Sequence, residues 1–554
     1  MPRVHSLVVL ILLVSCGQEG PRDRSSLLAG PRVPPPRIEA AGQPEPETAP
    51  STPAPIEAPR VKKDPETSTE GLLPDHTLGP LYPDAPLAIV RFDDIVTLDL
   101  VVRPRLDEIR QLLPQLKLPV GSARELLRKV LDLPTTVEIE DTRPFALVHI
   151  PEGWGVLLPL TDPAALPDAR QLNELYVLVG SEEVKAAYKP AGRMQRYLRG
   201  HLSVRMTRDV HATMEQAFRE AAGVIGLALP ELAESTDGDF LRYDVALNVG
   251  VRFLRLDYRA AARNGSATAK VLAKLQPGTT ESVQYLPPDG TLYFEWNIAP
   301  DLFKEIWGER VKDWRVPSFL TGDLACMLDL DPHGNALLIM VAKVSDPEAA
   351  ANFLGSEQMK EFFTVGTEND PRFKWEPAVF ERHGIAVGAL TGQLPRALKE
   401  AWEKSGNPML ATLAGVADGP TEAFSGVLKD KVFLVAGHRS RAETERYLDR
   451  FIIGAPEQND HTEFAGRLLH KRVAGVTVDL AALFDGTREA AYLWHKSADR
   501  LSDLTLRWPI PGAMAVTVEH GTVRAAVQVR MRAAAQATQR ILDVLKTARQ
   551  AEKR

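Results

Sequence analysis

The chain has 554 residues, and its 66 Lys and Arg residues against 73 Asp and Glu residues leave a formal net charge of −7. This balance lacks the basic excess that is typical of nucleic-acid-binding proteins, so we expect no nucleic acid among the partners. The chain contains two cysteines, Cys16 and Cys326, which permit at most one disulfide. Its length and ordinary apolar content are sufficient for a sizeable hydrophobic core.

The N-terminal residues have the parts of an export signal. Arg3 precedes an apolar run over residues 7–14, which is shorter than the ~20 residues of a membrane-spanning helix. A small residue, Ser15, precedes Cys16. The stretch Leu13-Val14-Ser15-Cys16 resembles the lipobox of bacterial lipoproteins, and the resemblance covers residues 1–17 only.

The resemblance implies a signal peptide over residues 1–15, lipidation of Cys16 with palmitate-type chains, and a membrane anchor made by this N-terminal lipid. Two or more acyl chains hold a protein stably on a bilayer, whereas one chain binds only marginally. Gly17 replaces the Asp that can retain a lipoprotein in the inner membrane, so the resemblance implies the cell envelope and, in a Gram-negative cell, the outer membrane. The alternative is an ordinary secretory signal with an incidental cysteine.

Residues 16–83 are predicted to form a tether. They are rich in Pro, Glu, Ala and Thr and have few large apolar side chains. Such a segment cannot bury enough apolar surface to offset the entropy of ordering, so we expect a disordered linker with extended, proline-rich stretches. A ligand for a proline-recognising domain is the sharper alternative.

The remaining sequence shows four kinds of unit that recur in the same order, which predicts two pseudo-repeats over residues 84–280 and 281–554. The first is strand, tight turn, strand and a helix that Asp-Pro opens, at Asp162-Pro163 and at Asp346-Pro347. The second is a strand followed by a helix with Ser181 or Ser440 as its N-cap. Two further strand-and-helix units follow in each half.

We therefore expect the α+β class, with two pseudo-repeats that each form a curved antiparallel sheet with helices packed on one face. In the last strand, Val523, Ala525, Val527 and Val529 alternate with polar residues, which predicts one covered face and one wet face. The two halves are expected to pack side by side with a groove between them.

No common catalytic or nucleotide-binding motif occurs in the sequence, so we predict no enzyme activity, no cofactor and no bound metal. We considered four polar clusters and one thiol, and a structural role is favoured for each. They are His438 to Arg441 at a helix start, His470 to Arg472 as a surface loop, Asp329 and Asp331 at a hairpin turn, Asp237, Asp239 and Asp244 at a turn, and Cys326 in a strand.

Aromatic residues crowd the start of the second repeat. Trp296, Phe303, Trp307 and Trp314 are weak candidates for a ligand groove, although packing in a core is the favoured interpretation.

The function that these features favour is a non-enzymatic binding or scaffolding role for a membrane-anchored envelope lipoprotein, with an envelope protein or a lipid as partner. One alternative is a carrier or chaperone for lipid or lipoprotein that uses an apolar groove. Another is an envelope hydrolase with an unrecognised site, because catalytic groups need not be close in sequence.

Overall fold

The structure is a computed structural model, and it describes the chain from Leu72 onward, with gaps. The described residues are 72–104, 107, 111, 121–211, 239–250, 252–302, 317–330, 336–356, 373–392, 421–437, 440–453, 468–469, 471–483, 510–530, 532–536 and 539–540. No helix within these ranges has the length and apolar character needed to cross a membrane.

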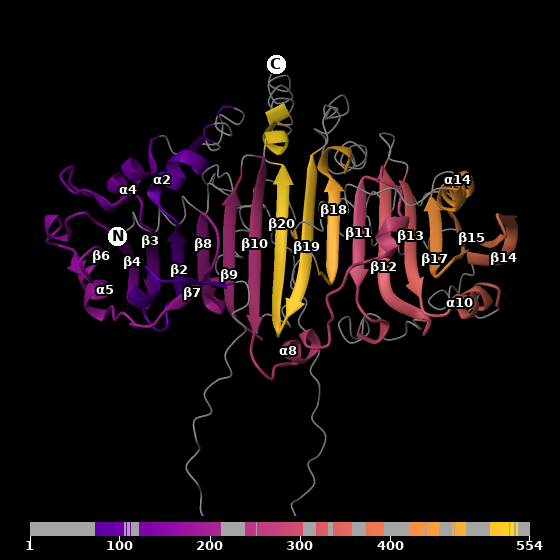
Figure 1. The fold of residues 1–554 in the computed structure, drawn as a ribbon, viewed down its shortest axis with the longest axis horizontal. Coiled ribbons are helices and arrows are strands. Elements are labelled where there is room, and N and C mark those ends of the chain that lie inside the picture. The colour runs from indigo at the N-terminus through magenta and orange to yellow at the C-terminus, as the bar shows by residue number, and fades with distance from the viewer. Residues whose placement is uncertain are drawn as a thin grey trace, which may run out of the picture.

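Eighteen of the described strands form one antiparallel sheet (Figure 1). From one edge to the centre the order is β5 (Arg170–Gln171), β6 (Tyr176–Gly180), β4 (Gly153–Pro159), β3 (Phe145–Ile150), β2 (Ala88–Phe92), β8 (Leu202–Thr207), β9 (Phe240–Val249) and β10 (Phe253–Ala262). From the centre to the other edge it is β20 (Thr522–Arg530), β19 (Pro511–Glu519), β18 (Ala474–Asp479), β11 (Leu292–Asn297), β12 (Leu320–Leu330), β13 (Ala336–Val344), β17 (Lys431–Gly437), β16 (Thr421–Leu428), β15 (Ile385–Gly392) and β14 (Phe373–Arg382).

The two halves of the sheet have the same strand order. The order β6-β4-β3-β2-β8-β9-β10 in the first half corresponds to β17-β13-β12-β11-β18-β19-β20 in the second. The corresponding strands β8 and β18 are both six residues long. The halves meet where β10 pairs with β20, with Asp257 opposite Ala526 near the middle of the ladder.

The predicted α+β class with two separate sheets is therefore wrong. Strands dominate the described residues, and the halves share one sheet instead of packing side by side across a groove. The sequence pattern located strands, but it could not indicate that β10, the last strand of the first half, pairs with β20, the last strand of the second. That pairing removes two sheet edges, whose unpaired backbone groups are otherwise a liability.

Helices cover both faces of the sheet at its two ends, and not a single face as expected (Figure 1). The described helices are α2 (Ile95–Thr97), α4 (Ala123–Leu131), α5 (Glu182–Ala187), α8 (Ala267–Leu272), α10 (Pro347–Leu354) and α14 (Ser440–Ile453), with short turns η1 (Gly79–Leu81), η2 (Leu98–Val102), η3 (Pro163–Ala165) and η4 (Ser282–Tyr285). The expected N-caps are confirmed at three of them, because Asp162, Ser181 and Asp346 each accept a backbone N–H of the first turn.

The core at the first end has two layers, one on each face of the sheet. On one face, Ile95 of α2 and Leu127 of α4 pack against strands β2, β3 and β4. On the opposite face, Val184 of α5 and Leu81 of η1 pack against the same strands. At the second end, Leu448 of α14 covers one face and the residues of α10 cover the other.

A two-stranded ribbon joins the first half of the sheet, and its first strand lies within the predicted tether. It consists of β1 (Leu72–Asp75) and β7 (Gln195–Leu198). Leu78 and Tyr82, which follow β1, are almost fully buried. The folded region therefore begins at least 12 residues before the predicted boundary after residue 83, since it already includes Leu72.

Candidate functional site

Several exposed apolar side chains lie together on the strands at which the two halves meet. On one face of β10, β20, β19, β18 and β11, three rows of cross-strand partners contain only apolar or aromatic residues and Gly. We call these rows the apolar band. The rows are Leu254, Val529, Gly512, Val478 and Leu292; Leu256, Val527, Met514, Val476 and Phe294; and Tyr258, Ala525, Val516, Ala474 and Trp296.

Part of the apolar band is in contact with solvent. Leu254 and Phe294 are each 37% exposed, and Leu256 and Met514 are each 39% exposed. Most of the remaining members are half-buried, but Leu292 is 4% exposed and belongs to a core cluster against which Val476 and Val478 pack. Single exposed apolar residues need no explanation, but a contiguous apolar patch is typical of an interaction site.

Much of the opposite face of these strands is buried, although many of its side chains are small or polar. Ala513, Ala515 and Ala526 pack there against Leu468, and Thr477 and Thr517 are almost fully buried. These strands thus bury small and polar side chains on one face, whereas on the other face several large apolar side chains stay accessible and Leu292 is buried.

Three arginines share one buried carboxylate on this second face, beside the junction. Asp244 of β9 is 2% exposed and accepts hydrogen bonds from Arg205 Nε at 2.9 Å, Arg242 Nε at 3.1 Å and Arg259 Nη1 at 3.2 Å. Burial lowers the pKa of Arg259, and Asp244 offsets part of this effect. Asp244 therefore ties three adjacent strands together, and it does not lie at a turn as the sequence suggested.

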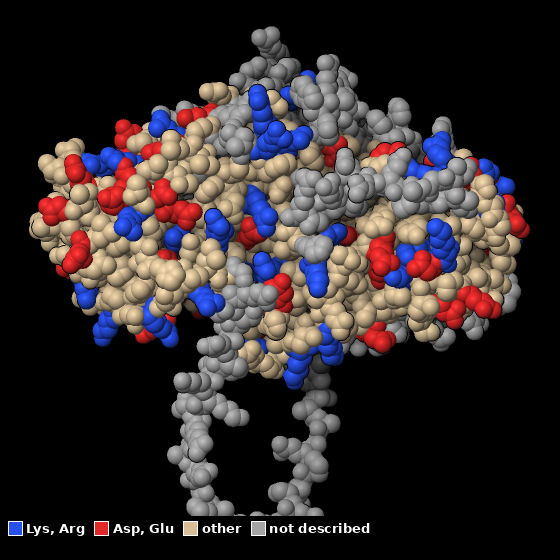
Figure 2. All heavy atoms as spheres, viewed as in Figure 1, with Lys and Arg blue, Asp and Glu red and all other residues tan. Residues whose placement is uncertain are grey.

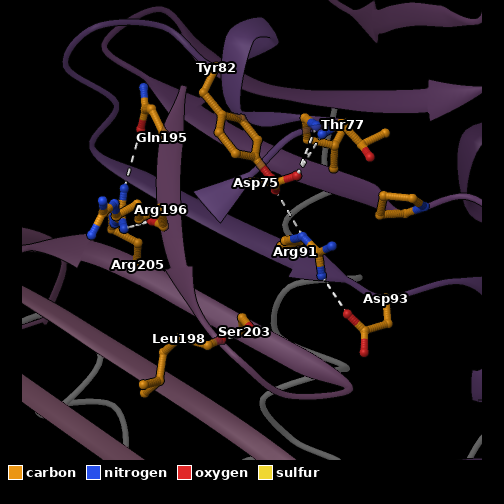
Figure 3. A network of polar contacts seen from close by, with 12 residues as sticks. Asp75, Thr77, Tyr82, Arg91, Asp93, Gln195, Arg196, Leu198, Ser203 and Arg205 are labelled. Atoms are coloured by element: carbon orange, nitrogen blue, oxygen red, sulfur yellow. Dashed lines mark hydrogen bonds and ion pairs between the residues drawn. The ribbon is translucent and has the colours of Figure 1, made fainter. Parts of the chain in front are cut away.

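A second polar network holds the ribbon on the sheet (Figure 3). Asp75 at the end of β1 accepts hydrogen bonds from Arg91 Nε at 2.9 Å and from the backbone N–H of Leu78 at 2.9 Å. The Arg91 guanidinium lies 3.9 Å from the ring centroid of Tyr197. Burial raises the pKa of Tyr82, whose hydroxyl donates to Asp75. Because every partner lies within the folded chain, this network has a structural role.

The equivalent position of the second half carries a charge of opposite sign. Glu295 is the fourth residue of β11, as Arg91 is of β2, and it pairs with Arg472, with Arg472 Nη2 2.6 Å from Glu295 Oε2. Both side chains are under 8% exposed. The prediction that residues 470–472 form a surface loop is wrong for Arg472, because Glu295 compensates its charge inside the protein.

One of the four aromatic candidates falls within the apolar band. Trp296 is half-buried at one corner of the band, next to Phe294 on the row above. Phe303, Trp307 and Trp314 lie outside the described residues, as do Cys16, Asp237, Asp331, His438, Arg439 and His470.

The other candidates have structural surroundings. Burial raises the pKa of the Cys326 thiol to about 12, which disfavours the nucleophilic thiolate at neutral pH. Asp329 accepts a hydrogen bond from Thr291 Oγ1 at 3.2 Å. Asp239 accepts one from the Thr268 backbone N–H at 3.0 Å, and Ser440 begins α14.

Charge on the surface is mixed. On the face drawn in Figure 2, Lys and Arg lie among Asp and Glu, with wide uncharged areas between them. Within the described ranges, no group of three or more His, Cys, Asp or Glu side chains could hold a metal ion. The apolar band is therefore the surface on which we base a functional proposal.

Comparison with models of known protein families gives no match, and no curated protein matches the chain. The functional proposal consequently rests on the residues of this chain alone.

Sequence reasoning identified the alternation in β20 but not how far each face is covered. Val527 and Val529 share one face, as the alternation predicted, and both are half-buried there, with Val529 packed against Ala481 and Ile510. A usable signal was present in β10 and β19, where Leu254, Leu256 and Met514 add long apolar side chains to the same rows. One strand read alone does not indicate which face another layer covers.

Proposed function

We propose that this protein is a non-enzymatic binding protein of the cell envelope, anchored to a membrane through lipidated Cys16, and that the apolar band is its binding surface. The observation that carries the proposal is the contiguous apolar surface at the junction strands, where Leu254, Leu256, Met514 and Phe294 are 37 to 39% exposed. An accessible surface of this kind lowers its free energy when another apolar group covers it.

The sheet beneath the apolar band is suited to holding such a surface rigidly. The five strands are paired on both sides along the band, so their backbone groups are satisfied within the ladder. The opposite face is packed with small residues, and the ion pair between Glu295 and Arg472 stabilises it. A surface that is already ordered loses little conformational entropy on binding.

In-cell photo-crosslinking of the full-length lipoprotein tests the proposal. A photo-reactive residue at Leu256 or Phe294 is expected to yield a discrete adduct, identified by its mass, after illumination of intact cells. Leu73 of β1 is the matched control, because it is 40% exposed and lies outside the band. Equal labelling at Leu73 and at the band positions, or no adduct at Leu256 and Phe294, would contradict the proposal.

The anchor has a separate test. Cys16→Ser is expected to abolish incorporation of labelled palmitate and to release the protein from the membrane fraction, since one or more acyl chains provide the attachment. Unchanged incorporation and fractionation would show that Cys16 is not the lipidated residue.

A further inference from the structure

We infer that the apolar band binds the hydrocarbon chain of a lipid. This inference rests on the proposed function, because it names the class of ligand for the same surface. Three properties of the band carry it: its chemistry, its size and the direction of its rows.

The chemistry of the band excludes a ligand with polar groups along its length. No ionisable side chain other than Tyr258 occurs in its three rows, and only Tyr258 and Trp296, both in the last row, carry a polar atom. The backbone N–H and C=O groups of these strands are already used in the ladder. A polar group pressed against the first two rows would therefore lose its hydration without gaining a hydrogen bond, which is unfavourable. A hydrocarbon chain has no polar group whose hydration would be lost.

The size of the band is too small for a second protein copy. Five strands with spacings of ~4.8 Å span about 19 Å, and three rows at every second residue cover about 14 Å along the strands. The resulting area of about 300 Å² is well below the ~800 Å² that each partner contributes to a stable protein–protein interface. The length of ~19 Å exceeds half of the ~30 Å hydrocarbon core of a bilayer, which is the depth that one acyl chain fills.

The direction of the rows indicates the path of the bound hydrocarbon chain. The middle row runs straight across the strands from Leu256 through Val527, Met514 and Val476 to Phe294. Its two ends and its centre are the most exposed positions of the row. Met514 at the centre has an unbranched, adaptable side chain that suits a ligand of variable shape. One extended chain laid along this row would contact all five residues.

Fluorescence titration with cis-parinaric acid, a fluorescent 18-carbon fatty acid, tests the inference on the full chain carrying Cys16→Ser. We expect saturable binding that shorter, water-soluble butyric acid does not displace. Leu256→Gln, Met514→Gln and Phe294→Gln are each expected to weaken binding by about tenfold. Leu73→Gln, at a residue exposed to the same extent outside the band, is expected to leave binding unchanged.

A second measurement keeps the test independent of folding defects. Thermal unfolding identifies any Gln variant that loses structure, and a photo-reactive fatty acid bound to the unsubstituted band is expected to label peptides from β10, β19 and β11. Absence of saturable binding, or binding that the Gln variants of the band do not weaken, would overturn the lipid inference.

The two proposals fail in distinguishable ways. If fatty acid does not bind but in-cell crosslinking at Phe294 and Leu256 yields a polypeptide adduct, the lipid inference is overturned and the proposed binding function stands. If neither experiment gives an adduct at the band, both proposals fall.

Discussion

The end of the sheet and its centre use the same rows of residues in different ways. The middle row of the apolar band continues through Leu247 of β9 and Leu202 of β8 to Phe92 and Phe145. At that end α2 and α4 cover the row, and Phe92 and Phe145 are 6% and 2% exposed. At the centre Leu256 is 39% exposed. Apolar character is constant along the row, so the layer above the sheet decides whether a position is core or surface.

The buried polar side chains differ in a complementary way. At the centre, Glu295 and Arg472 lie on the face opposite the apolar band, as do Asp244 and its three arginines. At the end, both faces of β3 and β4 are packed with apolar residues. The comparison indicates that ion pairs at the centre fix the geometry of a sheet whose apolar face remains available. Four predictions, ordered from the largest expected effect to the smallest, test and sharpen this comparison.

Truncating one aromatic side chain at the end of the sheet and one at its centre should lower the free energy of unfolding by different amounts. Phe145→Ala leaves a cavity beneath α2 and α4 and is expected to lower the free energy of unfolding by about 4 kcal/mol. Phe294→Ala removes a side chain that is 37% exposed, so the expected loss is below about 1 kcal/mol. Urea unfolding followed by circular dichroism measures both. Similar losses would mean that the band is core.

The charged face of the centre should be sensitive to loss of one partner. Glu295→Ala leaves the Arg472 guanidinium buried without its counter-charge, and we expect a loss of about 3 kcal/mol in the free energy of unfolding. The double variant Glu295→Met with Arg472→Met is expected to recover most of this loss, because no uncompensated charge remains. A double variant as unstable as Glu295→Ala would show that the pair does not act through charge compensation.

Two glycines of neighbouring strands distinguish the two faces of the centre. A Cβ on Gly475 would clash with the Glu295 side chain, so Gly475→Ala is expected to cost about 1–3 kcal/mol. A Cβ on Gly512 would lie on the apolar band, 3.5 Å from the nearest atom of Val478, and Gly512→Ala is expected to change stability by less than about 0.5 kcal/mol. Thermal unfolding of both variants under identical conditions gives the comparison, and equal destabilisation would contradict it.

The smallest effect is expected at the second end, where an exposed ion cluster joins the β14–β15 hairpin to α14. Hydrogen bonds from Arg382 and His383 lower the pKa of Asp449 to about 2. The unfolded pKa is ~3.9, so the stabilising contribution is present above about pH 4 and is lost as the pH falls through 2. The difference in Tm between the protein and Asp449→Asn should therefore be small at pH 6 and vanish near pH 2. A Tm difference that grows as the pH falls would contradict this prediction, because it would require the pKa of Asp449 to be raised by folding.

The sequence alone determined the positions of many elements. Alternation in residues 522–530, turn residues between strands and the caps at Asp162, Ser181 and Asp346 are local features, and the structure contains β20 and the three capped turns where these features lie. The lipobox resemblance is equally local, and it stays a prediction because Cys16 lies outside the described residues. Local chemistry fixes such features because their partners lie within a few residues.

Only the tertiary structure decided how the halves join and which residues form the candidate site. The pairing of β10 with β20 joins residues about 270 positions apart, and two strands with similar alternation give no sign of which partner each will take. The apolar band combines five strands from two distant parts of the chain, and among the described residues Trp296 is the sequence candidate that falls within it. Hydrophobic periodicity states which side chains share a face, but the free energy of covering that face depends on what packs against it, and this is a property of the whole fold.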